Sequence, residues 1–427
     1  MRRLTVYIQI RGEDLLCGEI RGMSFEDACF SYDPSWLERK EAAAISISLP
    51  LQAEAFDPRR TRAFFAALLP GGSFLSDLAR LLRCRPEDYL SMLSVLGSDC
   101  RGGLKILEED FPLPQASYED LDPQALKRLA GREQKDMASL LVRSSSALPG
   151  EAPCCCLRLR EDGSWQLPEG DMTGTHLILQ SRPLYERGLL NAALCMGAAK
   201  RLGIPAAGAA LLGKGGDHRI LLALERSDRV RSGRVPAGKE HAGEEERILR
   251  CHLEDMGQAL GTGQEKALER DYEGYMAAMF RLLRERAFRP IPDMISLWDR
   301  IVFNFLVGNL EGDVRSFGLL YSRDLRTLSL APAGCISCTA MYDPLSVKLP
   351  FHIDGCYSPD SLTGRSFERM APECGMGRKM GRERFDFLAG GLEKALYESA
   401  GELEKQGFED APSLAGQILE AGGIKNL

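Results

Sequence analysis

The sequence of 427 residues lacks any long hydrophobic run. A helix that spans a membrane needs about 18 or more consecutive apolar residues, and no stretch approaches that length. The N-terminus, MRRLTVYIQIRGEDLL, alternates polar and apolar residues and has no apolar signal-peptide core. We therefore expect a cytoplasmic protein with no membrane partner.

An excess of positive charge is also missing. Lys and Arg number 54 against 61 Asp and Glu, for a net charge of −7. A general nucleic-acid binder would show a basic balance or stripe. Any contact with DNA is therefore expected only through a partner protein.

Metal-ligand clusters are scarce as well. The five histidines are scattered, and the pair Cys335 and Cys338 has no second such pair to complete a site. A structural zinc site needs four ligands. The thirteen cysteines, Cys154, Cys155 and Cys156 among them, are therefore expected to be free thiols in a reducing compartment.

The hydrophobic pattern divides the chain into strand-rich and helix-rich parts. Leu4, Val6, Ile8 and Ile10 alternate with polar residues and predict a strand, and the alternation over 45–49 predicts another. Helices follow, so residues 1–110 are expected to form a small α+β domain. Charged, proline-containing residues 111–145 are expected to connect it to the rest of the chain.

The rest of the chain divides again. Residues 146–232 predict strands with one internal helix over about 189–202, whereas 233–427 are mainly helical, and the polar segment 232–247 is expected to be a surface loop. One predicted helix carries two adjacent apolar positions every turn and ends at Gly308. A β-rich lobe followed by a helical lobe is the order of a bilobal kinase-like fold.

Several motifs give this order a specific resemblance. They are FSYDPSWL and AISISLPL near the N-terminus, then THLILQ (175–180), ALERSDR (223–229), RCHLEDMGQALG (250–261), FNFLVGN (303–309) and KLPFHIDG (348–355). Together they resemble the HipA family, serine/threonine-kinase toxins of bacterial type II toxin–antitoxin modules. The resemblance implies an α+β fold: a small N-terminal domain, a β-rich kinase-like N-lobe and a helical C-lobe.

The resemblance also assigns the nucleotide-binding positions. Phosphoryl transfer needs a lysine on the phosphates, held by a helix glutamate. The lysine position of the family falls on Gln180 and the glutamate position on Ala192. The other implied nucleotide-binding positions are Gly150, Glu225 and Ser227. Glu151, next to Gly150, would bring negative charge toward the phosphates.

The catalytic loop of the family corresponds here to residues 308–317. Its aspartate base falls on Glu311, its histidine on Asp313 and its metal-binding asparagine on Ser316. The second metal-binding aspartate falls on Cys335, or on Asp343 in an alternative register that needs an eight-residue insertion.

These departures favour a HipA-like pseudokinase that acts by binding proteins and needs no cofactor. Its expected partner is a HipB-like helix-turn-helix antitoxin or another HipA-like protein. The alternative is an atypical serine/threonine kinase dependent on ATP and Mg²⁺. It would use Glu311 as base, Asp313 and Asp343 as metal ligands, and Arg182 on the phosphates.

Overall fold

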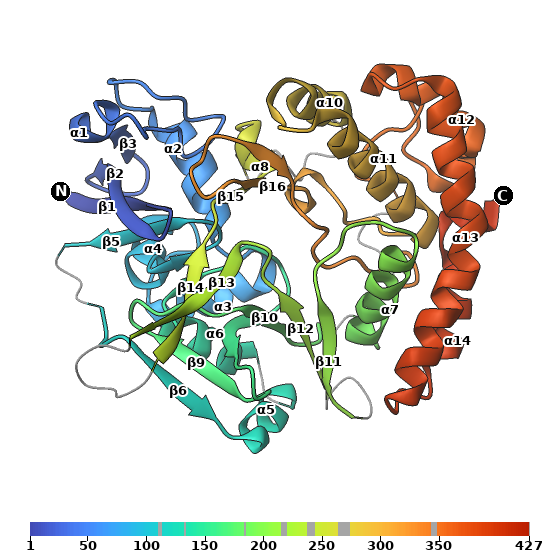
Figure 1. The fold of residues 1–427 in the computed structure, drawn as a ribbon, viewed down its shortest axis with the longest axis horizontal. Coiled ribbons are helices and arrows are strands. Elements are labelled where there is room, and N and C mark those ends of the chain that lie inside the picture. The colour runs from blue at the N-terminus through green and yellow to red at the C-terminus, as the bar shows by residue number, and fades with distance from the viewer. Residues whose placement is uncertain are drawn as a thin grey trace.

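The computed structural model describes residues 1–109, 113–131, 134–182, 185–214, 220–236, 244–263, 274–342 and 348–426. They form an α+β protein in which the larger helices gather on one side of the molecule and the two larger sheets on the other (Figure 1). No helix in the described ranges is long and apolar enough to cross a membrane.

The N-terminal part contains a four-stranded sheet in the order β3-β2-β1-β5. The strands are β1 (Arg2–Ile10), β2 (Glu13–Gly22), β3 (Cys29–Tyr32) and β5 (Leu104–Glu108). The helices are α1 (Pro34–Leu37), α2 (Pro58–Phe65), α3 (Gly72–Leu82) and α4 (Tyr89–Leu96), with η1 (Ala66–Leu68) after α2. The alternation in β1 buries Leu4, Val6 and Ile8 completely, as the sequence predicts.

The strand predicted over 45–49 is wrong. The backbone there turns, with one isolated bridge between Ser46 and Leu49. The amide of Ile45 donates to Tyr32 Oη at 2.9 Å, and the amide of Ile47 donates to Glu254 Oε1 at 3.2 Å. Side chains, and not a neighbouring strand, therefore satisfy this backbone, although the alternating pattern resembles that of a strand.

A six-stranded sheet in the order β11-β12-β10-β8-β9-β6 follows. Its strands are β6 (Ser117–Leu121), β8 (Cys154–Leu159), β9 (Trp165–Glu169), β10 (His176–Leu179), β11 (Ala209–Gly213) and β12 (Ile220–Glu225). Helices α5 (Pro123–Ala130), α6 (Gln134–Arg143) and α7 (Gly188–Arg201) accompany it. Residues 111–145 thus supply an edge strand of this sheet as well as two helices.

Two short pairings complete the strand-rich region. β4 (Asp99–Cys100) pairs in parallel with β7 (Ser146–Ala147). This pairing joins the N-terminal part to the segment that leads into the six-stranded sheet. β13 (Arg229–Pro236) and β14 (Glu244–Arg250) form an antiparallel hairpin. The surface loop expected over 232–247 is therefore wrong in its strand portions, because backbone pairing does not require apolar side chains.

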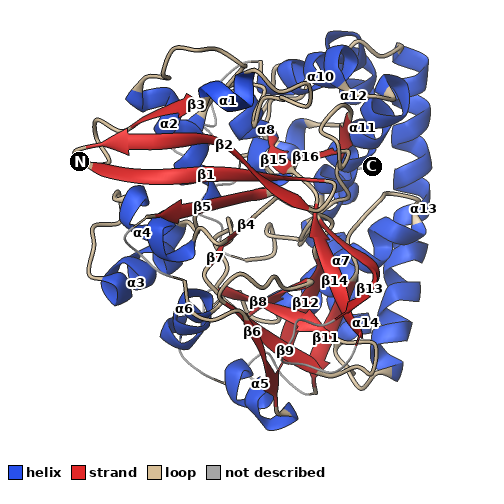
Figure 2. Ribbon diagram, turned by 60° about the vertical axis from the view of Figure 1, so that its left-hand side comes forward, coloured by secondary structure: helices blue, strands red, loops and turns tan. Residues whose placement is uncertain are grey.

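The remaining chain is mainly helical. Its helices are α8 (Met256–Ala259), α10 (Tyr275–Arg286), α11 (Pro290–Val307), α12 (Gly364–Met370), α13 (Arg378–Lys405) and α14 (Ala411–Ala421), with short 3₁₀ turns η3 (Val314–Ser316), η4 (Pro359–Ser361), η5 (Ala371–Cys374) and η6 (Gly423–Asn426). A three-stranded sheet joins β15 (Leu253–Asp255), β16 (Gly318–Tyr321) and β17 (Leu328–Leu330). Figure 2 shows α13 running beside α7 along the edge of the molecule, and the two elements contact each other.

Helix α11 positions the loop that follows it. Its apolar stripe is buried, and the helix ends where Gly308 adopts a left-handed φ of 73°. A glycine reaches this conformation without a steric penalty. Residues 309–317 therefore begin at a fixed point facing the six-stranded sheet.

Candidate functional site

A cavity of about 520 Å³ lies between the six-stranded sheet and the loop after α11. All the candidate residues that fall in the described ranges line it: Gly150, Gln180, Glu225, Ser227, Glu311, Asp313, Ser316 and Cys335. Asp343 lies outside the described residues. Positions up to 185 residues apart in the sequence, from 150 to 335, thus meet around one space.

Gln180, at the position that the resemblance assigns to the family lysine, carries no charge and is held by a hydrogen bond. Gln180, at the end of β10, is 5% exposed, and its Nε2 donates to the carbonyl oxygen of Leu129 on α5 at 3.1 Å. Ala192 on α7, at the position of the partner glutamate, also lines the cavity and presents only a methyl group. No ion pair can form between these two side chains.

Glu311 is engaged through both carboxylate oxygens. Its Oε2 lies 3.3 Å from Arg182 Nη1, and its Oε1 accepts from Tyr185 Oη at 2.5 Å. The Arg182 guanidinium also stacks over the Tyr185 ring, 4.4 Å from its centre. Burial and the hydrogen bond to Glu311 raise the pKa of Tyr185 to about 12, so the phenol stays protonated and donates.

Glu151 joins Arg182 to a second arginine. Its Oε2 lies 3.5 Å from Arg182 Nη2, and its Oε1 lies 3.9 Å from Arg315 Nη2. Arg315 in turn contacts Asp313 Oδ2 at 2.6 Å. Five side chains of alternating charge therefore follow one another across the cavity: Asp313, Arg315, Glu151, Arg182 and Glu311. We call these five residues the charge chain.

The backbone before Glu151 is fixed by the N-terminal part. The amide of Gly71, just before α3, donates to the carbonyl oxygen of Gly150 at 2.8 Å, and Pro70 forms an isolated bridge with Gly150. Gly150 has a φ of 135°, a conformation that L side chains rarely adopt. The position of Glu151 is thus set by contacts from another part of the chain.

The resemblance places the two metal positions of the family on Ser316, which carries a hydroxyl, and on Cys335, which carries a thiol, with Asp343 as the alternative to Cys335. Mg²⁺ prefers carboxylate and other hard oxygen ligands in octahedral geometry. In the ranges that the structure describes, no group of three or more His, Cys, Asp or Glu side chains could hold a metal ion. The Cys335 thiol is a soft ligand that does not suit Mg²⁺, whereas Asp343, the alternative position, lies outside the described residues. All thirteen cysteines fall in the described ranges and are free thiols.

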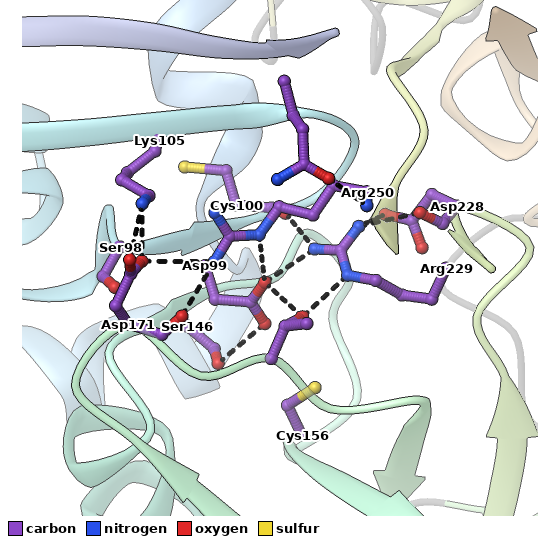
Figure 3. A network of polar contacts seen from close by, with 12 residues as sticks. Ser98, Asp99, Cys100, Lys105, Ser146, Cys156, Asp171, Asp228, Arg229 and Arg250 are labelled. Atoms are coloured by element: carbon purple, nitrogen blue, oxygen red, sulfur yellow. Dashed lines mark hydrogen bonds and ion pairs between the residues drawn. The ribbon is translucent and has the colours of Figure 1, made fainter. Parts of the chain in front are cut away.

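A buried polar network around Asp99, Asp228 and Arg229 holds the ALERSDR segment (Figure 3). Glu225 and Ser227 of this segment line the cavity. Asp99 on β4 contacts Arg226 Nη1 at 2.8 Å and Arg229 Nη2 at 2.6 Å. Burial opposes ionisation of Asp99, but the two guanidinium groups hold its pKa well below the usual range. The network therefore ties this cavity wall to the N-terminal part.

Sequence reasoning missed several cavity residues. The motifs did not identify Tyr185 or Arg315. They also did not identify the ion pair between Arg101 and Asp255, which are 3.6 Å apart. Burial raises the pKa of Asp255 to about 6, partly opposed by Arg101. Two features of the sequence could have identified them. Tyr185 lies five residues after Gln180, and Arg315 lies inside the loop that corresponds to the catalytic loop of the family.

Comparison with known proteins gives a consistent match. Residues 8–107 match the HipA N-terminal domain, and residues 146–396 match the HipA-like C-terminal domain. A putative kinase of Sinorhizobium fredii, Y4mE, is 28% identical over 386 residues, covering 87% of this chain and 86% of the relative. The serine/threonine-protein kinase toxin HipA of Shewanella oneidensis is 22% identical over 391 residues, covering 88% and 85%.

The fold matches a solved structure as well. The structure of HipA from Shewanella oneidensis MR-1, in a complex with HipB and operator DNA, has a TM-score of 0.76 and 18% identity. The match covers 98% of this chain and 96% of that one. At this identity the match establishes the shared fold.

Proposed function

This chain belongs to the HipA family of toxin–antitoxin kinases, and on that premise we propose that it is a pseudokinase: it keeps the family fold, transfers no phosphate and acts by binding other proteins.

The contact between Arg182 and Glu311, 3.3 Å long, carries this proposal. A base at the Glu311 position must accept a hydroxyl proton from a substrate. Here both of its oxygens are already engaged, one by Arg182 and one by Tyr185. Arg182 is the nearest substitute for the missing lysine, so the same contact also occupies the group that would neutralise the phosphates.

The charge chain supports the proposal in a second way. Glu151 and Glu311 place negative charge where transferred phosphate would develop its own, whereas catalysis needs positive charge there. The Cys335 thiol does not suit the Mg²⁺ that would offset this repulsion.

We further propose a partner of the HipB type, a helix-turn-helix protein, or a second HipA-like protein. The Shewanella relative was solved with HipB and operator DNA. A net charge of −7 makes direct DNA binding unfavourable, so DNA would be reached through that partner. Size-exclusion chromatography of the chain, mixed with a HipB-type helix-turn-helix protein, tests this point: two separate peaks would exclude that partner.

One observation favours the atypical kinase as a second candidate. Every described candidate position lines the same cavity, and the two relatives are named as kinases. In that mechanism Glu311 would be the base, Asp313 and Asp343 would hold Mg²⁺, and Arg182 would bind the phosphates. Arg182 and Asp313 would first have to leave Glu311 and Arg315.

Thermal unfolding with ATP and Mg²⁺ separates the two candidates. A ligand at about 100 times its Kd stabilises a protein by roughly 2.7 kcal/mol, which gives a clear increase in Tm. We expect no increase at millimolar ATP. Single-turnover transfer from labelled ATP follows, with wild type, Glu311→Gln and the exposed control Glu420→Gln. Transfer by wild type and Glu420→Gln that is lost in Glu311→Gln would establish the kinase instead.

A further inference from the structure

We propose that the corner between α10 and α11 binds a short acidic segment of a partner protein, in which carboxylates flank an apolar side chain. Six exposed residues form this surface, which we call the arginine corner: Arg281, Arg284, Arg286, Phe288, Arg289 and Ile291. All six belong to the described residues, and none of them lines the cavity. The corner therefore goes beyond the proposed function and does not depend on whether the chain transfers phosphate.

Two observations place the ends of the arginine corner beside each other. A Cβ on Gly375 would lie 2.6 Å from Arg284 Nη1 and 3.7 Å from Met294 Cε, so the Arg284 guanidinium of α10 lies close to the start of α11. Ile291 comes three residues before Met294 and therefore lies on the same face of α11. Charged side chains of one helix and an apolar side chain of the next thus belong to one surface, on the helix-rich side of the molecule (Figure 1).

The four arginines of the corner have no carboxylate partner in the part of the chain that the structure describes, since none of them forms an ion pair there. Glu285, four residues after Arg281, is exposed and is not paired with it. Several arginines on other helices do pair within about one turn: Arg60 with Asp57, Arg80 with Asp77 and Arg382 with Asp386. The corner therefore offers guanidinium groups that a carboxylate from outside can bind.

Helix stability accounts for only part of this cluster. Arg284 and Arg286 lie in the last turn of α10, where the helix dipole favours positive charge. Arg289 instead immediately precedes α11, where the dipole disfavours positive charge, and its side chain forms no capping hydrogen bond. Four arginines and one glutamate fall within residues 281–291 of a chain whose net charge is −7. This local excess of positive charge is complementary to an acidic ligand.

Phe288 and Ile291 supply an apolar contact between these charges. Phe288 is 71% exposed and Ile291 is 68% exposed, whereas most large apolar side chains of the described ranges are buried. The amide of Phe288 donates to the carbonyl oxygen of Leu328 on β17 at 2.8 Å, so the backbone that presents the ring is fixed. Aromatic residues and arginine are enriched in protein interfaces. A partner segment that covers both side chains would gain from removing them from water.

The charge of the whole chain distinguishes a short peptide from larger anions. A nucleic acid or an anionic membrane presents a continuous negative surface, and the net charge of −7 opposes its close approach. A short segment meets mainly the positive charge of the corner, because exposed charges more than about 10 Å away are largely screened at 0.1 M salt. A short acidic segment of a protein is therefore the ligand that the charges favour.

Fluorescence anisotropy with the full chain tests the proposal. The probe is a fluorescein-labelled synthetic peptide with glutamates on both sides of a central pair of leucines, and a matched peptide carries glutamine in place of each glutamate. Arg284→Gln combined with Arg289→Gln should weaken binding of the acidic peptide about tenfold, because two charge-assisted contacts are lost. Phe288→Ser should also weaken it about tenfold, through lost apolar burial. Added salt should weaken binding to wild type more than binding to the double variant.

Two variants serve as matched controls. Arg59→Gln removes an exposed arginine on α2, and Phe387→Ser removes a phenylalanine on α13 that is 54% exposed. Both should bind the acidic peptide as wild type does, and circular dichroism checks that every variant is folded.

Three results would overturn the proposal: no binding of the acidic peptide, equal binding of the two peptides, or equal loss in the corner and control variants. Duplex DNA and vesicles of phosphatidylcholine and phosphatidylserine are compared in the same assay by competition. If either displaces the peptide at lower concentration than unlabelled peptide does, the corner belongs to that ligand and the proposal fails. Phosphate transfer from ATP would refute the pseudokinase alone and would leave the corner unaffected.

Discussion

Glu254 on β15 is a fully buried carboxylate that joins distant parts of the chain. It accepts hydrogen bonds from Tyr321 Oη and Ser46 Oγ, each at 2.5 Å, and from the amide of Ile47 at 3.2 Å. Burial, partly opposed by these hydrogen bonds, raises its pKa from 4.5 to about 7. The folded protein therefore keeps a proton that the unfolded chain releases between these two pH values.

This proton determines whether the free energy of unfolding rises or falls with pH. Where the folded state binds more protons than the unfolded state, the free energy of unfolding falls as pH rises. Between about pH 5 and pH 8, wild type should lose on the order of 1–3 kcal/mol of stability relative to Glu254→Gln. Urea denaturation across this range measures the difference.

Neighbouring groups titrate too, but they are present in both proteins. Burial lowers the pKa of His252 to about 4 and raises that of Asp255 to about 6. Subtracting the curve of Glu254→Gln from that of wild type isolates Glu254. Parallel curves would show that Glu254 is not the group responsible, and Glu420→Gln should give a curve parallel to wild type.

At the scale of elements, the end of α11 sets the geometry of the cavity loop. A Cβ on Gly308 would lie 2.9 Å from Ala340 Cβ and 3.1 Å from Gly422 Cα, in a backbone conformation with φ of 73°. Gly308→Ala should therefore lower the free energy of unfolding by about 1–3 kcal/mol. Chemical denaturation measures it. The matched control is Gly334→Ala in the cavity wall, where a Cβ meets nothing within 4 Å; an equal loss in both variants would contradict this account.

The elements that the sequence predicts well are those whose pattern reflects burial alone. Helix α11 and strand β1 bury one stripe or one face against a large core, so their periodicity is clear. The alternation over 45–49 fails because Ile45 and Leu49 are buried beneath a turn held by the side chains of Tyr32 and Glu254. Such contacts leave no periodic signal.

Strands with polar surfaces were missed for a related reason. Strand β6 is the edge of its sheet and includes Glu119 and Asp120, both exposed, so it has no apolar alternation. Strands β13 and β14 pair with each other in a two-stranded sheet and have the polar composition of a loop. In both cases backbone pairing, which the side chains do not reveal, decides the structure.

At the scale of the whole molecule, the candidate residues that the motifs identify line one cavity, but the motifs do not predict the contacts among these residues. Glu311, Asp313 and Ser316 share a single loop, so their proximity follows from the chain itself. Arg182 and Glu311 are 129 positions apart, and no local pattern links them. The charge chain emerges only when the lobes pack together, and it bears directly on whether the loop can act in catalysis.

The same packing predicts that the N-terminal part and the six-stranded sheet unfold together. β4 pairs with β7, and Asp99 lies buried between Arg226 and Arg229. Each of the three tryptophans can report on the unfolding of a different part of the chain, because Trp36 lies in α1, Trp165 in β9 and Trp298 in α11. With 5-fluorotryptophan incorporated, the native ¹⁹F signals of Trp36 and Trp165 should disappear at the same urea concentration.

Asp99→Asn should break this coupling. It removes one of the two carboxylates, Asp99 and Asp228, that the buried guanidinium groups of Arg226 and Arg229 share. Removing one partner of a buried ion pair typically costs about 3–5 kcal/mol. The transitions of Trp36 and Trp165 should then occur at different urea concentrations, while Asp162→Asn, in an exposed turn, should leave them coincident. Separate transitions in wild type would instead mean that the N-terminal part is an independent folding unit, and that the polar network serves only to orient the ALERSDR segment at the cavity wall.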